Sequence, residues 1–162
     1  MIVVGGGAVL GVLAGGPLGD HLLRTGRLHG RVLVAATAAA ATPLLFIPAL
    51  LARSALTALP YVVLAAAALS AQNPPIDAAR LDIMPAPLWG RAEGVRTFVR
   101  AGAQAMAPLL FGTLSDLLGG GHAGLQWTFV IMLLPLGASA LFLFRALRTY
   151  PVDVATAAVH HR

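Results

Sequence analysis

The sequence predicts an all-α, polytopic membrane protein with five transmembrane helices. Of its 162 residues, 58% are hydrophobic and only 10% are charged, and the mean hydropathy is +0.83. Soluble domains are less apolar and more charged. The apolar residues form five continuous runs, each near the roughly 20 residues that cross a bilayer. The predicted spans are residues 1–18, 32–52, 56–73, 97–118 and 125–145.

Each span is predicted to be a helix rather than a barrel strand, because the runs are continuous in Ala and Leu and do not alternate. Prolines inside the runs predict kinks, since membrane helices can satisfy the freed carbonyls in other ways. They are Pro43, Pro48, Pro60, Pro108 and Pro135. The fourth span begins with Arg96 and Arg100, whose long side chains can reach the membrane interface.

The distribution of Arg predicts the orientation. Arg is frequent in alternate connections and at the carboxyl end, whereas Arg53 alone lies on the other side. By the positive-inside rule, the Arg-rich segments face the cytoplasm of a multi-pass cell-membrane protein. They contain Arg24, Arg27 and Arg31, then Arg80, Arg91, Arg96 and Arg100, then Arg145, Arg148 and Arg162. The chain thus divides into a bundle over residues 1–148 and a cytoplasmic tail over 149–162.

Several other classes of protein are not favoured. The net charge of +5 lies in short Arg clusters between apolar runs, so no nucleic-acid partner is predicted. The absence of Cys excludes disulfides and thiolate metal sites. Gly5, Gly6 and Gly7 lack the preceding strand of a dinucleotide-binding loop, and Ser115 lacks a nucleophile elbow. No enzyme, metal or cofactor is predicted.

Four glycines recur at a spacing of four residues near the amino terminus. Gly7, Gly11, Gly15 and Gly19 would lie along one stripe of a helix. Only small residues allow two helix backbones to approach closely. We therefore expect this stripe to contact a neighbouring helix.

The stripe leads into a short polar turn, residues 15–27, with the sequence GGPLGDHLLRTGR. This segment resembles the loop signature of the major facilitator superfamily, Gly-x-Leu-Gly/Ala-Asp-Arg-x-Gly-Arg. Gly16, Leu18, Gly19 and Asp20 match in place, and His21 stands where the family has a basic residue. Three residues then intervene before the final Gly-Arg pair.

Two further segments resemble family elements in the family's order. Residues 85–94, PAPLWGRAEG, resemble the Pro-x-x-x-Arg-Gly-x-Ala-x-Gly element before the eleventh helix, with Gly and Arg in reversed order. Residues 108–116, PLLFGTLSD, resemble the Pro-x-x-x-Gly-x-x-x-Asp ending of that helix. The resemblance implies the last five helices of a twelve-helix transporter, a partial carboxyl-terminal bundle. The apolar start of the chain, MIVV, agrees with a fragment that lacks the amino-terminal half.

By this resemblance, the protein moves a small solute between two helical halves, with efflux of amphiphilic compounds slightly favoured over sugar uptake. The resemblance also implies a gating loop in which Asp20 pairs with Arg24 or Arg27. A carboxylate that only ties the turn together is the structural alternative. The predicted gating residues are Gly16, Gly19, Asp20, Arg24 and Arg27.

Polar residues inside apolar spans are costly and are therefore candidates for lining a solute cavity. They are Tyr61, Ser70, Gln72, Thr97 and Gln104. For Gln104, a hydrogen bond to a neighbouring helix is the favoured alternative. Asn73-Pro74-Pro75 is interpreted as a helix-ending turn, followed by a cytoplasmic loop that holds Asp77, Asp82 and Glu93.

A second class of function stays open, a stand-alone five-helix membrane scaffold or assembly subunit without transport activity. The transporter hypothesis requires three partners, namely the bilayer, a small solute and an amino-terminal half. An upstream reading frame that encodes about seven apolar spans favours the transporter, and an isolated gene favours the scaffold.

Overall fold

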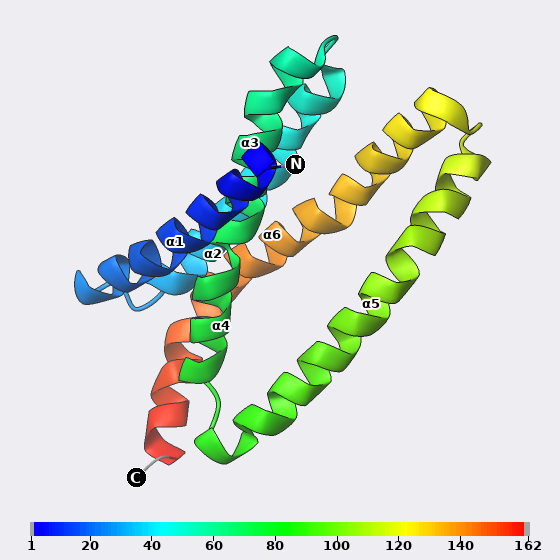
Figure 1. Cartoon of the computed structure of the whole chain (residues 1–162). Helices are drawn as coiled ribbons and strands as arrows, with labels where there is room; N and C mark the ends of the chain where they lie inside the picture. The colour runs from blue at the N-terminus through cyan, green and yellow to red at the C-terminus, as the bar shows by residue number, and fades with distance from the viewer. Residues whose placement is uncertain (1, 161–162) are drawn as a thin grey trace.

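The computed structural model describes the backbone of residues 2–160 and the side chains of residues 2–157. Met1, at the start of the first predicted span, and Arg162 lie outside the described residues. Within them every regular element is helical (Figure 1). The elements are α1 (Ile2–Arg24), α2 (Gly30–Leu51), α3 (Ala55–Ala71), α4 (Asn73–Asp82), the short 3-10 helix η1 (Ala86–Leu88), α5 (Trp89–Leu117) and α6 (Gly121–His160).

Four described segments are long and apolar enough to cross a membrane. They are Ile2–Arg24, Gly30–Leu51, Ala55–Asp82 and Gly121–Ala157. The long apolar helices indicate a membrane protein, as predicted. The count of five spans is not confirmed, because the predicted span 97–118 lies within α5. That helix is 29 residues long, but Arg96, Arg100 and Gln104 dilute its apolar character.

The segment that follows α3 differs from its prediction. α3 ends at Ala71, as a helix-ending turn requires, but α4 begins at Asn73, with proline in its first turn. Proline is tolerated there because the first amide hydrogens of a helix have no intrahelical partner. Asp77 and Asp82 therefore lie on a helix rather than in the predicted loop.

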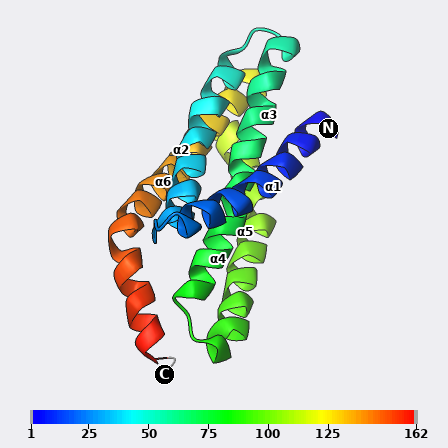
Figure 2. The ribbon, with the colours of Figure 1, turned by 90° about the vertical axis from the view of Figure 1, so that its left-hand side faces the viewer.

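The predicted tail, residues 149–162, also begins inside a helix. α6 continues without a break through residue 148 as far as His160 and contains Pro135 and Pro151. Figure 2 shows that its carboxyl-terminal part bends away from the axis of its first part. This part packs on α2 and α4 through Tyr150, which anchors it to the bundle.

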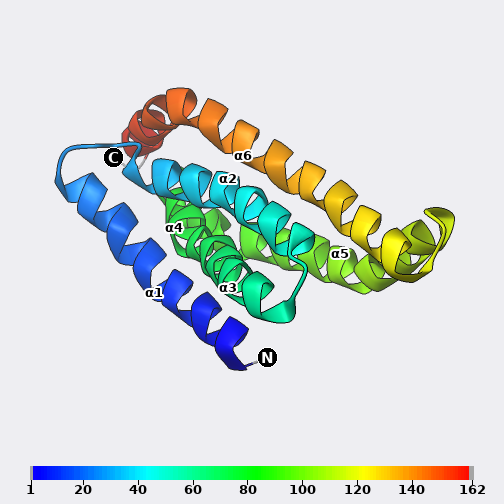
Figure 3. The same ribbon diagram turned by 90° about the horizontal axis from the view of Figure 1, so that it is seen from above.

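α1 packs closely on α3 and confirms the interpretation of the glycine stripe (Figure 3). A Cβ atom at Gly11 or Gly15 would clash with the backbone of Ala67 or Ala71. At Gly7 it would come within 2.7 Å of the carbonyl oxygen of Val63. The stripe residues Gly7, Gly11, Gly15 and Gly19 are all buried.

α2 lies in the middle of the molecule, beside α1, α3 and α6 (Figure 3). Its interior face is made of small residues, and Ala35, Ala36 and Ala39 have no exposed surface. Thr42 is fully buried as well, and its hydroxyl donates to the carbonyl of Ala38 at 2.9 Å. Small side chains thus allow close helix packing with the polar groups satisfied.

α5 stands apart from this group. It joins α6 through a turn in which Gly119, Gly120 and Gly121 have φ of 97°, 64° and 58°, a conformation that favours glycine. The rings of Phe111 and Phe129 meet edge to face beside the turn, with centroids 4.9 Å apart. Ser115 is the only buried residue of α5.

Two interhelical contacts define the ends of the bundle. At one end, Arg31 of α2 contacts Asp82 of α4, near where the α1–α2 turn and the last part of α6 also lie (Figure 1). At the other end, Gln126 of α6 donates to the carbonyl of Leu50 at 3.2 Å. The first contact thus brings the start of α2 to the end of α4, and the orientation predicted from the Arg residues stays a prediction.

Candidate functional site

Four helices meet around a single guanidinium at the Arg-rich end. The Nε and Nη2 of Arg31 donate to Oδ1 of Asp20 at 3.1 and 2.8 Å. The Nη1 of Arg31 donates to Oδ1 and Oδ2 of Asp82 at 2.8 and 2.6 Å. The hydroxyl of Tyr150 donates to Oδ2 of Asp82 at 2.6 Å. We call Asp20, Arg31, Asp82 and Tyr150 the Arg31 network.

Small residues of the α1–α2 hairpin place Arg31 between its two carboxylates. Gly26 has φ of 86°, which suits the tight turn after α1. A Cβ at Gly30 would lie 2.6 Å from that of Leu22, so glycine allows the two helices to meet here. A Cβ at Gly19 would lie 3.4 Å from the Cγ of Arg31, so the Arg31 side chain passes directly over this glycine.

Tyr150 holds the end of α6 against the network. It is only 6% exposed and packs with Val32 of α2 and Ala79 of α4. Ala146, Leu147 and Val154 surround this cluster. Because the Asp82 side chain is only 30% exposed, its contacts with Arg31 and Tyr150 are less screened by water than those of a fully exposed pair.

The ion pairs of the Arg31 network hold the helices together and can also break. The planar guanidinium carries five N–H donors and serves two carboxylates at once. The side chain of Arg31 is 19% exposed, while those of Asp20 and Asp82 are 46% and 30% exposed. Water can therefore reach the carboxylates and replace the pairs when the helices separate.

The structure places the predicted gating residues as follows. Asp20 is in the network, but its partner is Arg31, so the predicted pairing with Arg24 or Arg27 is wrong. Arg31 approaches from α2 across the helix interface, whereas Arg24 and Arg27 are exposed and form no ion pair among the described residues. A Cβ at Gly16 would lie 3.5 Å from the Cβ of Pro74, an ordinary contact.

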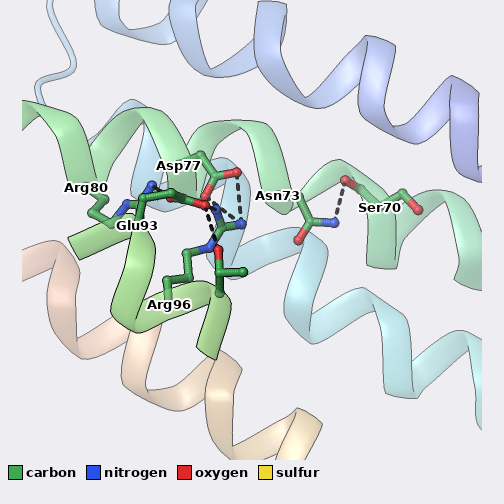
Figure 4. A network of polar contacts seen from close by, with 7 residues as sticks. Ser70, Asn73, Asp77, Arg80, Glu93 and Arg96 are labelled. Carbon is green, nitrogen blue, oxygen red and sulfur yellow. Dashed lines mark hydrogen bonds and ion pairs between the residues drawn. The ribbon is translucent and has the colours of Figure 1, made fainter. Parts of the chain in front are cut away.

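A second set of charges joins α4 to α5 (Figure 4). Arg96 contacts Asp77 at 3.0 Å and Glu93 at 3.1 Å. Arg80 contacts Glu93 at 2.6 Å, and the Thr97 hydroxyl donates to Glu93 at 3.4 Å. We call Asp77, Arg80, Glu93, Arg96 and Thr97 the Arg96 network.

The Arg96 network is the more exposed of the two. Its charged side chains are 24% to 49% exposed. The hydrogen bond from Arg80, helped by Arg96, lowers the pKa of the Glu93 carboxyl below its ordinary value. Arg80 uses Nη2 for this bond, while its Nε and Nη1 are buried without a hydrogen-bond partner in the described structure.

A pocket of about 480 Å³ lies between α3, α4 and α5, next to the Arg96 network. Its lining residues are Leu69, Ser70, Gln72, Asn73, Ile76, Asp77, Arg96 and Arg100. Two of the predicted cavity residues, Ser70 and Gln72, are therefore brought together with charged residues of α4 and α5.

The other predicted cavity residues do not line this pocket. Thr97 belongs to the Arg96 network, and Tyr61 is 41% exposed on α3. Gln104 is exposed on α5 and makes no side-chain hydrogen bond within the described residues. The favoured alternative for Gln104, a hydrogen bond to another helix, is therefore not found in this chain.

Sequence reasoning missed Arg31, Asp82 and Tyr150 as members of one site. Asp82 lies 51 residues from Arg31 and 68 residues from Tyr150 along the chain, so no local spacing links them. The described residues contain no group of three or more acidic or His side chains arranged to hold a metal ion.

The comparisons with known proteins add no assignment. No protein-family model, curated protein or solved structure matches the chain. The class that the helices define is therefore an all-helical membrane protein, with an interhelical charge network at one end.

Proposed function

We propose that this chain is part of a secondary transporter of the major facilitator type, which moves a small solute across the cell membrane. The observation that carries the proposal is the Arg31 network, in which one guanidinium links α1, α2 and α4 while Tyr150 adds α6. Asp20, the acidic residue of the facilitator-like signature, is one of its members. The network is proposed to close the cytoplasmic end.

A transporter that alternates access needs contacts that close one end and then release it. Ion pairs at helix ends suit this task, because water replaces the lost hydrogen bonds when the pair breaks. The glycine contacts of α1 with α3 do not suit it, since separation exposes buried backbone without any comparable compensation. Opening is therefore proposed to break the Arg31 network and to leave α1 on α3.

The proposed partner is an amino-terminal helical half that packs against this chain. The accessible surface is 10569 Å², whereas a compact soluble monomer of 16.6 kDa would have about 7,600 Å². α5 is one of the exposed helices, with Phe98 81% and Val95 66% exposed. Lipid and the second half would cover this surface, with the solute held between the halves.

The test restores a complete transporter. This chain is co-expressed with the amino-terminal half encoded upstream, and flux of a panel of labelled solutes is measured in vesicles. We expect flux from the pair, with Arg31→Gln and Asp20→Ala reducing it about ten-fold or more, in line with the loss of charge-assisted hydrogen bonds. Arg24→Gln is the control, because Arg24 is exposed and lies outside the network.

Two outcomes would contradict the proposal. Absence of flux for every solute, despite membrane insertion of both pieces, would favour the scaffold. Flux from the 162-residue chain alone would show that no second half is needed, unless cross-linking detected a homo-oligomer that supplied the opposing wall.

A further inference from the structure

The pocket between α3, α4 and α5 carries a surplus of positive charge. In and beside it, three guanidinium groups face only two carboxylates. The carboxylates of Asp77 and Glu93 are bound by Arg96 and Arg80. Arg100 lines the pocket but has no ion pair or hydrogen bond to any described residue, so its charge is available to an anion from outside the chain.

Neutral hydrogen-bond donors line the same pocket as Arg100, and Figure 4 shows two of the residues that supply them, Ser70 and Asn73. The Ser70 hydroxyl makes no hydrogen bond to the described residues. The amide of Gln72 donates once, to the carbonyl of Leu69 at 3.1 Å, and that of Asn73 once, to the carbonyl of Ser70 at 3.4 Å. Each amide thus keeps one further N–H. A guanidinium, a hydroxyl and two amides together suit an oxyanion with several acceptors.

The surroundings indicate that the anion belongs to an amphiphile. Leu69 and Ile76 line the pocket itself. Arg100 lies in the first turns of the predicted fourth span, from which a long Arg side chain can reach the membrane interface. Basic pockets between helices on the cytoplasmic side are known to hold anionic headgroups.

We propose that this pocket binds the phosphate of an anionic phospholipid, with Arg100 as its main charged contact and Ser70 as a hydrogen-bond donor. The acyl chains would extend from the pocket along the apolar side chains of Leu69 and Ile76. Bound lipid would thereby fill the space between α5 and the α3–α4 segment. This inference does not depend on transport, since it requires only the folded chain in a membrane.

The test is native mass spectrometry of the purified full chain with added phosphatidylglycerol or phosphatidylcholine. We expect tighter binding of phosphatidylglycerol, and we expect Arg100→Gln to weaken it about ten-fold by removing a charge and its hydrogen bonds. Ser70→Ala should weaken it about two- to five-fold. Arg91→Gln is the matched control, because it removes the same charge from α5 outside the pocket, and it should change the affinity less than two-fold.

Three results would overturn the proposal. Equal losses of lipid affinity in Arg100→Gln and Arg91→Gln would show general electrostatic attraction without a specific binding site. Unchanged affinity in Arg100→Gln would exclude Arg100 as a contact of the lipid. Binding of inorganic phosphate alone, as tight as that of the lipid and equally dependent on Arg100, would assign the pocket to a free anion. If circular dichroism shows that Arg100→Gln loses helical content, the lipid affinities of Ser70→Ala and Arg100→Lys test the proposal instead. Arg100→Lys keeps the charge and should keep most of the affinity.

Discussion

α1 and α5 are attached to the α3–α4 segment in different ways. α1 lies directly on α3 through glycines that meet the backbone of Ala67 and Ala71. α5 reaches α4 through exposed charged side chains of the Arg96 network, and otherwise packs mainly on α6. The first contact depends on shape and the second on charge. The comparison indicates which helices move as one body and which can separate.

A glycine contact and an ion pair respond differently to change. Close packing of backbones loses many dispersion contacts when one side chain is added. An exposed ion pair contributes about 0–1 kcal/mol, because water competes for its groups. We therefore expect α1–α3 to be the permanent contact and α4–α5 the adjustable one, with the partly buried Arg31 network between these extremes.

The largest effect is expected from Gly11→Ala. The new methyl group would meet the backbone of Ala67, so α1 must shift away from α3, at a cost of about 1–3 kcal/mol. The measurement is unfolding in mixed micelles. Gly6→Ala is the matched control, because nothing lies within 4 Å of its Cβ position and alanine favours the helix. Equal free energies of unfolding for the two variants would contradict the proposed role of close glycine packing between α1 and α3.

An effect of the same order is expected from Arg31→Gln. The variant leaves the carboxylates of Asp20 and Asp82 without their cation, at a cost of about 1–3 kcal/mol. Arg24→Gln removes the same charge from an exposed position and should change stability by less than about 0.5 kcal/mol. If both variants have the same free energy of unfolding, the Arg31 network affects stability only through the net charge of the chain.

A smaller effect on stability, but a clear one on geometry, is expected from Arg96→Gln. It removes the pairs with Asp77 and Glu93, which are exposed and in which water competes for the charged groups. Spin labels at Leu64→Cys on α3 and Gln104→Cys on α5 should then show a broader distance distribution. Arg91→Gln should leave the distribution unchanged, and an equally narrow distribution in Arg96→Gln would show that charge does not hold α5.

The smallest effect is a dependence on pH. Because its partners lower the pKa of Glu93 below the ordinary 4.5, this carboxylate stabilises the α4–α5 contact above about pH 4.5, and the contribution is lost as the pH falls through the lowered pKa. The same label pair should report a broader distribution at about pH 3 than at neutral pH. Glu93→Gln should reduce the change. A broadening centred near neutral pH would contradict this assignment.

Much of the fold was predictable, because hydropathy and glycine spacing act locally. The predicted span 32–52 matches α2 closely, and the glycine stripe identified the packing face of α1. α1 itself continues past the predicted end at residue 18 to Arg24, so much of the predicted polar turn 15–27 is helical. α4 was not predicted, since Asn73-Pro74-Pro75 can end one helix and also begin the next. The helical continuation of α6 past residue 148 depends on the packing of Tyr150, a tertiary contact that local patterns do not reveal.

The candidate site was only partly predictable. Asp20 was identified by its place in the signature, but its partner was sought among the nearest Arg residues. In the folded chain, the geometry of the α1–α2 hairpin places Arg31 beside Asp20. Asp82 and Tyr150 join it only because α4 and α6 end at the same place. In a helical membrane protein the polar partners of one site are commonly far apart in sequence, so spacing alone does not pair them.

The most direct test of the central claim, that Arg31 holds one end of the bundle closed, is a distance measurement across that end. The chain has no cysteine, so spin labels can be placed at Leu18→Cys on α1 and Val152→Cys on α6, both exposed positions. In lipid nanodiscs we predict one short, narrow distance for the parent chain and for Arg24→Gln. Arg31→Gln should add a longer population, whereas identical distributions in all three would contradict the account.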